Sequence, residues 1–355
     1  MTDFEKLTDF RNLYNAYLVS VKGCQSKHRA DAFRYMALDN LIVMKQELVD
    51  RTYELDPYHD HIVKEPKQRL IMVGSFRDKV LQHSLCDNVI MPKMQHVFLL
   101  DNYAGQTGKG TLFGLDRLSE QLHNYYDRYG CDGYILKCDI SKFYYSIPHD
   151  AVKRCLFQWF EDDGIRWICE KIIDSVPDPG LPLGNQSSQV FALVLLHELD
   201  VLIKEELHCD FYGRYVDDFF LISPDKEFLK SCLRRIEEYL GSIGLSLNHK
   251  TEIVPIKKGI RFLGFHVYLT DDGHVIRLLD GKNKRKEKKR LRRDAQLVLS
   301  GKMTVGKYHE KYQSWRNHAS HGNCWRLIHS MDKYEADLIK EYSEVPIWDI
   351  IPTTH

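Results

Sequence analysis

Three aspartates occupy positions where carboxylates are unusual. Asp139 ends an apolar stretch that is expected to form a strand, and Asp217 and Asp218 fill the tight connection between two further apolar stretches. Charges beside buried strands cost free energy unless something neutralises them, and neighbouring like charges raise that cost. Carboxylates are the preferred ligands of Mg²⁺. Two such cations about 3.5–4 Å apart form the usual clamp for in-line phosphoryl transfer, so Asp139 and Asp217 predict that chemistry.

The aspartate pair also has a simpler interpretation, because aspartate is common in ordinary turns. The flanking sequence favours the functional interpretation. Residues 219–222 continue directly from the pair as Phe-Phe-Leu-Ile, which predicts a buried strand and places the pair against a core.

The composition is that of an ordinary globular protein. The 355 residues are 43% hydrophobic and 28% charged, which suits two or three subdomains. Fifty basic and fifty acidic residues give a net charge of zero, which alone argues weakly against a nucleic-acid partner. Nine cysteines without a CxxC pair are expected to be reduced thiols in the cytoplasm. No signal-peptide pattern is visible, and no apolar run approaches the ~18–20 residues of a membrane span, so we expect no membrane partner.

The order of expected elements is that of an α+β domain with an antiparallel sheet, followed by a helical domain. It lacks the regular alternation of a doubly wound sheet. Between residues 66 and 125 we expect short strands mixed with one helix. The expected helices cover residues 4–20, 28–50, 78–89, 149–176, 186–206, 226–243 and 283–340, and the main strands cover 134–140, 211–216, 219–223, 252–256 and 261–268.

Six blocks of the sequence resemble the reverse transcriptase family, over roughly residues 60–330. Any one block is weak, whereas six in the family's order are a specific signal. The resemblance implies a right-hand polymerase with fingers, palm and thumb, which copies an RNA template into DNA from dNTPs and a primer. The blocks are RLIMVGSFRDKVLQ (69–82), LKCDISKFYYSI (136–147), GLPLGNQSSQ (180–189), YVDDFFLI (215–222), GLSLNHKT (244–251) and FLGF (262–265).

The resemblance also assigns parts of the hand. The fingers would lie in 61–135, the palm in 136–275 with part of 149–190 contributing to the fingers, and the thumb in 276–340. Residues 1–60 would form a helical N-terminal extension and 341–355 a C-terminal tail.

Carried over residue by residue, the resemblance makes Asp139, Asp217 and Asp218 the catalytic carboxylates. With the backbone of Ile140 they would hold two Mg²⁺ ions, with Mn²⁺ as an alternative. Tyr144, five residues after Asp139, matches the aromatic steric gate that rejects a 2′-hydroxyl. Its alternative role is core packing in an aromatic-rich strand.

Further positions match substrate-binding positions of the family. Lys67, Arg69 and Arg77 fall in the fingers block that holds the incoming triphosphate, and arginine suits bidentate phosphate contact. Arg77 has an alternative role in a local ion pair with Asp78. Lys250 matches a lysine proposed to protonate the pyrophosphate, and its alternative is a surface lysine on a loop.

The block GLPLGNQSSQ departs from the common family pattern. Leu183 stands where glutamine usually precedes Gly184, and Gln189 stands where the motif usually ends in proline. These features, with residues 101–111 and 314–327, resemble reverse transcriptases of diversity-generating retroelements. Members of that branch, encoded by bacteria or phage, copy a template RNA with frequent errors opposite adenine, and the cDNA rewrites a variable region of a target gene by mutagenic retrohoming. They work with a small, basic, oligomeric accessory protein.

Loss of the glutamine has a physical consequence as well. Leu183 offers only apolar contact, so a hydrogen bond in the nucleotide pocket would be missing and discrimination should fall. We therefore expect lowered fidelity.

Two further stretches, one in the predicted thumb and one in the predicted palm, would contact the template–primer. Lys282 to Arg293 holds nine basic residues and one acidic residue. On charge alone this is a solvated helix face, but in a thumb it would follow the backbone of an A-like duplex. Phe262 to Phe265 resembles the strand that grips the primer end.

Two other motifs fail as sites. GQTGKGT (105–111) lacks the first glycine of a phosphate-binding P-loop, because Tyr103 stands there, and we interpret it as a mobile, nucleic-acid-facing loop. His318, His321 and Cys324 are conceivable zinc ligands, but zinc pairs on helices usually show His at i and i+4. The thumb resemblance makes packing or duplex contact the better interpretation.

Three alternatives to this function stay open. One is a reverse transcriptase of a group II intron, a retron or a phage-defence system, which a neighbouring template and variable repeat pair would exclude. Another is a non-catalytic, maturase-like RNA-binding protein, against which the intact aspartates argue. The last is a template-independent polymerase, which homopolymer extension without template would reveal.

Overall fold

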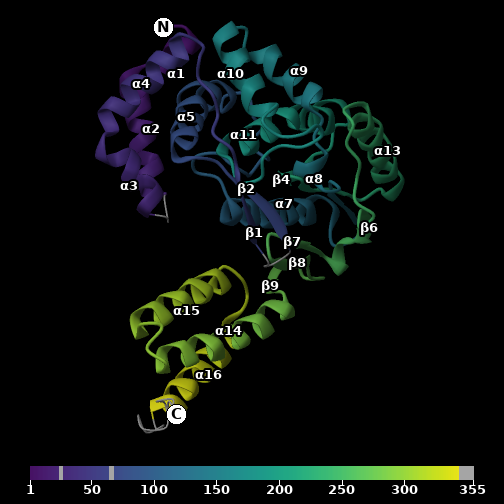
Figure 1. Ribbon diagram of the computed structural model, residues 1–355. Helices are drawn as coiled ribbons and strands as arrows, with labels where there is room; N and C mark the ends of the chain where they lie inside the picture. Colours follow the sequence, from purple (N-terminus) through teal and green to yellow (C-terminus); the bar gives the residue numbers. More distant parts are fainter. Residues whose placement is uncertain (24–26, 64–67, 344–355) are drawn as a thin grey trace. The chain divides into compact units, whose positions relative to one another are not determined.

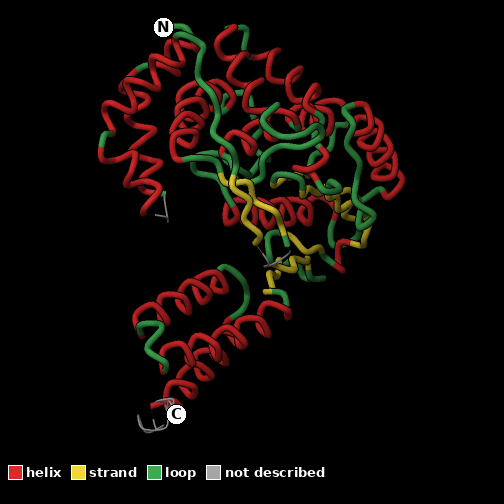
Figure 2. The backbone as a smooth tube through the Cα atoms, in the orientation of Figure 1, coloured by secondary structure: helices red, strands yellow, loops and turns green. Residues whose placement is uncertain are grey.

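The computed structural model describes residues 1–23, 27–63 and 68–343 of the chain. Their contacts divide the chain into two compact units, and helices form most of each (Figure 1, Figure 2). The division differs from the predicted fingers, palm and thumb, whose boundaries stay predictions. The first unit combines Met1–Gly114 with Leu136–Ile253, and the second combines Leu115–Ile135 with Val254–His355.

The N-terminal segment of the first unit is helical, as predicted. Helix α1 (Asp3–Thr8) begins with a capping box in which Thr2 and Glu5 bond each other's backbone amides. Asp9 ends α1 and caps α2 (Phe10–Lys22) with a hydrogen bond to the amide of Asn12. Helices α3 (Lys27–Tyr35) and α4 (Ala37–Val49) follow.

A hairpin and a broken helix come next in the first unit. Strands β1 (His59–Val63) and β2 (Arg69–Val73) pair antiparallel. Helix α5 (Phe76–Leu85) starts earlier than the predicted 78–89 helix because Ser75 caps it, with 3.0 Å from the amide of Asp78 to Ser75 Oγ. One π-helical turn, η1 (Cys86–Ile90), then leads into α6 (Met91–Met94).

The central sheet has four strands in the order β4-β5-β3-β6. Strands β4 (Phe211–Tyr215) and β5 (Asp218–Ser223) form a hairpin in which Tyr215 pairs with Asp218. Strand β3 (Tyr134–Asp139) lies beside β5, and β6 (Glu252–Pro255) lies on the other side of β3. This arrangement, with the antiparallel β4–β5 hairpin on one side of the sheet, confirms the predicted α+β class.

The helices between the strands of this sheet in the sequence contribute to the core of the first unit. They are α9 (His149–Trp159), α10 (Asp163–Ile173), α11 (Gln186–Leu195), α12 (His197–Val201), the π-helical turn η2 (Leu202–Glu206) and α13 (Lys226–Ser242). The stretch Gln186–Glu206 is long and apolar enough to cross a membrane by length and composition, contrary to expectation, but 78% of its apolar window is buried in the structure. It is therefore the core helix of this unit.

The second unit contains a small sheet and a helical bundle. Strands β7 (Ile260–Phe262), β8 (Phe265–Leu269) and β9 (Val275–Leu279) form an antiparallel sheet in that order, preceded by the short turn η3 (Ile256–Lys258). Helix α7 (Thr111–Tyr129) contributes from Leu115 onward. The bundle consists of α14 (Gly281–Leu299), α15 (Val305–Ser320) and α16 (Trp325–Ser343).

Several local expectations were wrong. Residues 111–129 form one helix because Leu115, Leu118 and Leu122 recur at helical spacing and are buried. The aromatic residues after Asp139 are not a strand, because Lys142 takes a left-handed conformation with φ of 47° and starts the short helix α8 (Phe143–Ser146). The predicted helix over 149–176 divides where Asp162 caps α10, and strand β9 was not foreseen.

Candidate active site

Backbone hydrogen bonds bring the two key carboxylate-bearing segments together. Asp139 is the last residue of β3, and Asp217 lies in the two-residue connection of the β4–β5 hairpin. The amide of Ile140 donates to the carbonyl oxygen of Asp217 over 3.2 Å. The end of β3 is therefore fixed against the hairpin turn, and two residues far apart in the sequence become neighbours.

The electrostatics of this site need a positive charge. Burial raises the pKa of Asp217 above its ordinary value, and the neighbouring carboxylate of Asp139 raises it further. Arg69 and Lys137 act in the opposite direction. Two half-buried carboxylates that repel each other are a donor set suited to hard cations.

Asp218 is held differently from the other two aspartates. Its carboxylate forms an ion pair with the ammonium group of Lys137 on β3, and the side chains are 31% and 15% exposed. Asp218 therefore has a protein counter-ion of its own. Within residues 1–23, 27–63 and 68–343, no three His, Cys, Asp or Glu side chains gather closely enough to hold a metal by themselves. Asp139 and Asp217 would need substrate phosphates or water as further ligands, as Mg²⁺ sites commonly use.

Asn248 supports Asp139 from the segment before β6. Its side-chain Nδ2 donates to Asp139 Oδ2 over 3.2 Å, and its backbone amide donates to the carbonyl oxygen of Asp139 over 2.7 Å. Asn248 Oδ1 in turn accepts from the amide of Lys250 over 3.2 Å. Lys250, whose side chain is exposed, thus sits on a turn that is tied to Asp139.

Tyr144 lies on helix α8, close to the carboxylates. Burial raises the pKa of its hydroxyl well above the ordinary value, with Asp217 as the next cause and Arg69 acting in the opposite direction. Its carbonyl oxygen accepts from the amide of Leu181 over 2.8 Å. Tyr144, Asp217 and Arg69 therefore share one electrostatic neighbourhood. Phe143, by contrast, is buried and packs its ring 5.3 Å from that of Tyr144.

The motif at 180–189 runs beside strand β2. The amide of Met72 donates to the carbonyl oxygen of Leu183 over 2.9 Å. Gly184 has a φ of 122°, and a Cβ there would lie 2.7 Å from Ile71 Cγ2, so only glycine allows this close approach. Leu183 is half-buried at this junction, and Gln189 is exposed on α11.

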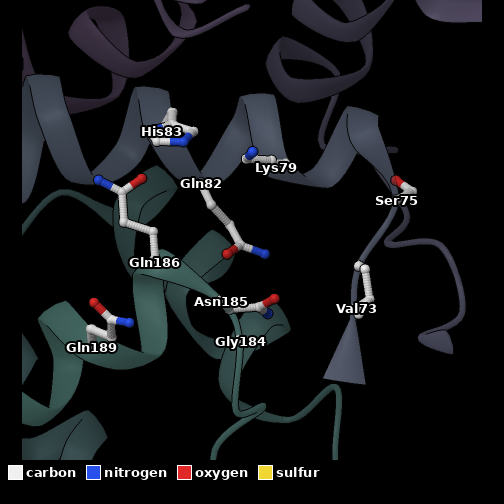
Figure 3. Close-up of a pocket in the computed structure, with 10 residues that line it drawn as sticks. Val73, Ser75, Lys79, Gln82, His83, Gly184, Asn185, Gln186 and Gln189 are labelled. Atoms are coloured by element: carbon white, nitrogen blue, oxygen red, sulfur yellow. The ribbon is translucent and has the colours of Figure 1, made fainter. Parts of the chain in front are cut away.

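A cavity of about 320 Å³ opens where this motif meets helix α5 (Figure 3). Gln82 reaches from α5 toward the start of α11, and its Oε1 accepts from Ser187 Oγ over 3.1 Å. The lining is polar and includes amides, a hydroxyl, an imidazole and an ammonium group. Its residues are Val73, Gly74, Ser75, Lys79, Gln82, His83, Gly184, Asn185, Gln186 and Gln189.

Arg77, a predicted triphosphate ligand, stands apart from this group. Arg77 forms an ion pair with Glu47, and its guanidinium lies 4.2 Å from the ring centre of Tyr53. The alternative pair of Arg77 with Asp78 is not formed, since Asp78 accepts from Tyr53, Ser75 and the amide of Asp56. Binding of a triphosphate by Arg77 stays a prediction, and it would require the guanidinium to leave Glu47. Lys67 lies outside the described residues.

The glycine-rich loop, which we expected to be mobile, is joined to the preceding turn by side-chain hydrogen bonds. Lys109 Nζ donates to the carbonyl oxygens of Leu99, Leu100 and Asn102 over 3.1, 3.1 and 2.9 Å. Gln106 also donates to Asn102 O. The lysine of GQTGKGT therefore fastens the loop to the preceding turn.

The second unit holds the predicted thumb residues. Its helix α14 buries Glu287 and Asp294, which pair with Arg290 and Lys311. Exposed basic side chains recur along the rest of this helix, namely Lys282, Arg285, Lys286, Lys289, Arg292 and Arg293.

The histidines and cysteine considered for zinc also lie in the second unit, where His318 and Cys324 pack and His321 is exposed. His318 has its ring 5.0 Å from that of Phe265, and Cys324 Sγ accepts from the amide of Leu279 over 3.3 Å. They belong to no metal-binding group among the described residues. Phe262 and Phe265 are buried in β7 and β8.

Sequence reasoning missed three residues that support the carboxylates. Lys137 lies two positions before Asp139 on the same face of β3. Its charge could therefore have indicated a counter-ion for the carboxylates. Asn248 gave no signal of its own, because its partner Asp139 is 109 residues away, and the pairing of the buried Arg214 with Asp200 depends on how α12 packs against β4.

The part of the chain that carries this site matches a known protein family. Residues 62–267, more than half of the chain, match the family model described as "Reverse transcriptase (RNA-dependent DNA polymerase)". The chain therefore belongs to the reverse transcriptase family. The description of the matched family is that of RNA-dependent DNA polymerases, and the expected right-hand polymerase fold is confirmed.

Solved structures with a similar chain fold include two telomerases. Telomerase from Candida albicans, in complex with a fragment of telomeric RNA, is 15% identical with a TM-score of 0.49, and the match covers 81% of this chain and 55% of that one. A truncated apo telomerase from Candida tropicalis is 15% identical with a TM-score of 0.47, covering 65% and 58%. The chain thus spans less than two thirds of the length of either protein.

Proposed function

We propose that this protein copies an RNA template into DNA by two-metal nucleotidyl transfer at Asp139 and Asp217. The observation that carries the proposal is the 3.2 Å hydrogen bond from Ile140 N to Asp217 O, which joins the two carboxylate-bearing segments. The raised pKa of Asp217 supports it, because the same two carboxylates repel each other when no cation lies between them.

Two bound Mg²⁺ ions, or Mn²⁺, would supply activation of the attacking hydroxyl and charge neutralisation at the leaving pyrophosphate. Asp139 and Asp217 would hold them, with the carbonyl of Ile140 as a further ligand. Asp218 would act more peripherally, since it is paired with Lys137. Asn248 orients Asp139 through the 3.2 Å hydrogen bond to its carboxylate.

The incoming nucleotide would lie between α8, β2 and the motif at 180–189. Tyr144 would exclude a 2′-hydroxyl sterically, and Arg69 would contact the triphosphate, which its planar guanidinium suits. Their shared electrostatic neighbourhood with Asp217 supports these roles. Lys67 is proposed as a second phosphate contact, and Lys250 as the group that gives a proton to the leaving pyrophosphate.

Template RNA, primer and dNTPs are the proposed partners. The exposed basic face of α14 suits contact with phosphates of the template–primer, because its acidic residues are buried on the opposite side. The salt dependence of such binding would report the number of phosphates neutralised.

We further propose that the enzyme serves a diversity-generating retroelement in the cytoplasm of a bacterium. The support is the sequence at Leu183 and Gln189, which resembles that branch. With Leu183 as the residue before Gly184, this position supplies no amide to the nucleotide, and errors opposite template adenine should be frequent. A small, basic, oligomeric accessory protein would be the partner in this role.

The test is primer extension on an RNA template with Mg²⁺, followed by sequencing of the products. Asp217→Asn should abolish extension, whereas Asp150→Asn, which changes an exposed aspartate in the first turn of α9, should not. Errors concentrated at template adenines would support the retroelement branch, and accurate copying would exclude it while leaving the polymerase. Extension that persists in Asp217→Asn would contradict the proposed site. Silence with template RNA and accessory protein supplied would favour a non-catalytic RNA-binding role.

A further inference from the structure

An arginine that is completely buried lies just before the catalytic turn. Arg214 is on β4, three residues from Asp217, and its side chain has no exposed surface. All three of its guanidinium nitrogens donate hydrogen bonds to groups of the protein. A charge in such a place requires both a counter-ion and acceptors for its remaining N–H groups.

The counter-ion comes from a helix. Asp200, also fully buried, lies on α12 and receives two hydrogen bonds from the guanidinium, Nε to Oδ1 over 2.6 Å and Nη2 to Oδ2 over 2.5 Å. Tyr212 adds a third, from its hydroxyl to Asp200 Oδ1 over 2.5 Å. The pair is therefore bidentate, which fixes the plane of the guanidinium as well as its position.

The other end of the guanidinium holds the turn. Arg214 Nη1 donates to the carbonyl oxygen of Val216 over 2.9 Å. That carbonyl belongs to the peptide that joins Val216 to Asp217, so its direction sets the backbone of Asp217. Val216 has a φ of 60°, a conformation that is rare for a β-branched residue and that the surrounding contacts must impose.

The backbone of Arg214 is anchored independently. Its amide donates to Asp101 O over 2.9 Å, and its carbonyl oxygen accepts from Tyr103 N over 2.8 Å. At the preceding residue, a Cβ on Gly213 would lie 2.2 Å from Tyr103 OH, so this segment packs tightly against residues 101–103. A shift of Arg214 would therefore break hydrogen bonds of its backbone as well as those of its side chain.

We infer that Asp200 and Arg214 are positioning residues for the catalytic turn: their buried ion pair holds the Val216 carbonyl and thereby keeps Asp217 opposite Asp139. The inference rests on the metal-binding role proposed for Asp217. A purely structural pair could be replaced by apolar side chains of similar size without loss of folding, as many buried ion pairs can. Apolar side chains cannot replace the hydrogen bond to Val216. Replacing the pair by apolar residues therefore distinguishes a positioning role from a purely structural one.

The deciding variant is Asp200→Leu combined with Arg214→Met. It removes both charges together and leaves no unpaired one in the core. Arg166→Met is the matched control, since Arg166 also donates to two backbone carbonyls, of Phe160 and Phe157, but away from the turn. Three measurements apply to each protein: hydrogen exchange of peptides covering residues 215–219, Mn²⁺ affinity by electron paramagnetic resonance, and kcat and KM in primer extension.

The expected result for the double variant is cooperative unfolding with faster exchange in the 215–219 peptide. Its Mn²⁺ affinity and kcat should fall about 10- to 100-fold, the usual effect of losing an outer partner of a metal ligand, while the KM for dNTP changes little. The control should match the wild type in all three. A folded double variant with wild-type exchange and Mn²⁺ affinity would overturn the inference.

A double variant that does not fold and a wild type that binds no Mn²⁺ each leave a deciding measurement. If the double variant does not fold, Arg214→Lys decides, because one ammonium group keeps the charge but cannot hold Asp200 bidentately and reach Val216 as well. It should show the same faster exchange, and normal exchange would overturn the inference. If the wild type binds no Mn²⁺, the proposed function fails, and the exchange measurement still decides whether Asp200 and Arg214 hold the turn.

Discussion

Asn248 Nδ2 donates a hydrogen bond to Asp139 Oδ2 over 3.2 Å, and its backbone amide donates to the carbonyl oxygen of the same aspartate over 2.7 Å. The segment that carries Lys250 is thus tied to the end of β3. A carboxylate with one oxygen held by an amide has its other oxygen oriented, which is how outer partners tune metal ligands.

We expect Asn248→Ala to lower kcat about 10- to 100-fold, because Asp139 would lose its orientation. Stability should fall by only about 1 kcal/mol, the usual contribution of one hydrogen bond. Steady-state primer extension at several Mg²⁺ concentrations measures the first effect, and urea unfolding the second. Asn88→Ala is the control, because Asn88 also donates its side-chain amide, to Ser84 O over 3.1 Å, but outside the site. Equal kcat in the two variants would show that Asn248 does not orient Asp139.

The raised pKa of Asp217 predicts a pH dependence of stability in the absence of metal. Its cause is burial, followed by the charge of Asp139. The folded state holds the proton more tightly than the unfolded chain, so this stabilisation is present below the ordinary value near 4 and is lost as the pH rises through the folded pKa. At pH 7 the ionised carboxylate therefore opposes folding until a cation binds.

Asp217→Asn should consequently melt higher than the wild type at pH 7 in chelator, by a shift on the order of 2 °C. The difference should shrink as the pH is lowered to 4, and added Mg²⁺ should stabilise the wild type more than the variant. Thermal unfolding at both pH values, with and without Mg²⁺, measures these changes. Asp150→Asn should follow the wild type throughout. The same pH slope in wild type and Asp217→Asn would contradict the electrostatic account.

Lys137 and Asp218 should be energetically coupled through their ion pair. Lys137→Met leaves Asp218 without its counter-ion beside two other carboxylates, so stability should fall by roughly 1–2 kcal/mol after allowing for the partial exposure of the pair. Asp218→Asn in that background should recover part of the loss. Urea unfolding of both single variants and the double variant gives the coupling energy. Strictly additive effects would mean that the contact contributes nothing.

The sequence predicted what depends on local pattern. Strand β3, the Asp217-Asp218 hairpin and the long helix from Gln186 all follow from apolar spacing and turn residues, as did the candidate carboxylates. It could not predict the bonds that arrange these pieces. Asn248 and Asp139 are 109 residues apart, and neither residue type nor spacing indicates that they meet.

Backbone conformation also escaped prediction. The turn to α8 depends on a left-handed Lys142, and the connection between β4 and β5 on a left-handed Val216, although neither residue favours that region. Tertiary contacts impose these conformations, so the strand expected after Asp139 became a helix. Arg77 shows the same limit, since its partner Glu47 lies on another helix.

Tyr144 supports a prediction about sugar discrimination. If its ring lies under the sugar, Tyr144→Val should raise the incorporation of ribonucleotides at least about 10-fold relative to deoxynucleotides, because the steric barrier to the 2′-hydroxyl is removed. Single-nucleotide extension with matched dNTP and rNTP pairs measures the ratio. Tyr145→Val is the control, because Tyr145 is the exposed neighbour whose hydroxyl bonds Leu70 O. If this ratio is unchanged in Tyr144→Val, Tyr144 only packs against its neighbours and does not select the sugar.

Leu183 carries the prediction about fidelity. It is half-buried, and its carbonyl oxygen is held by Met72 N, so a longer polar side chain can enter the site without changing the backbone. Leu183→Gln would supply an amide, which should lower misincorporation at template adenines by on the order of 10-fold. Leu183→Met changes the shape without adding a donor, and its error rate should stay at the wild-type level. Sequencing of cDNA from one RNA template compares all three enzymes. If Leu183→Gln leaves the error spectrum unchanged, the missing amide is not the source of errors, and fidelity must be set by other residues of the pocket.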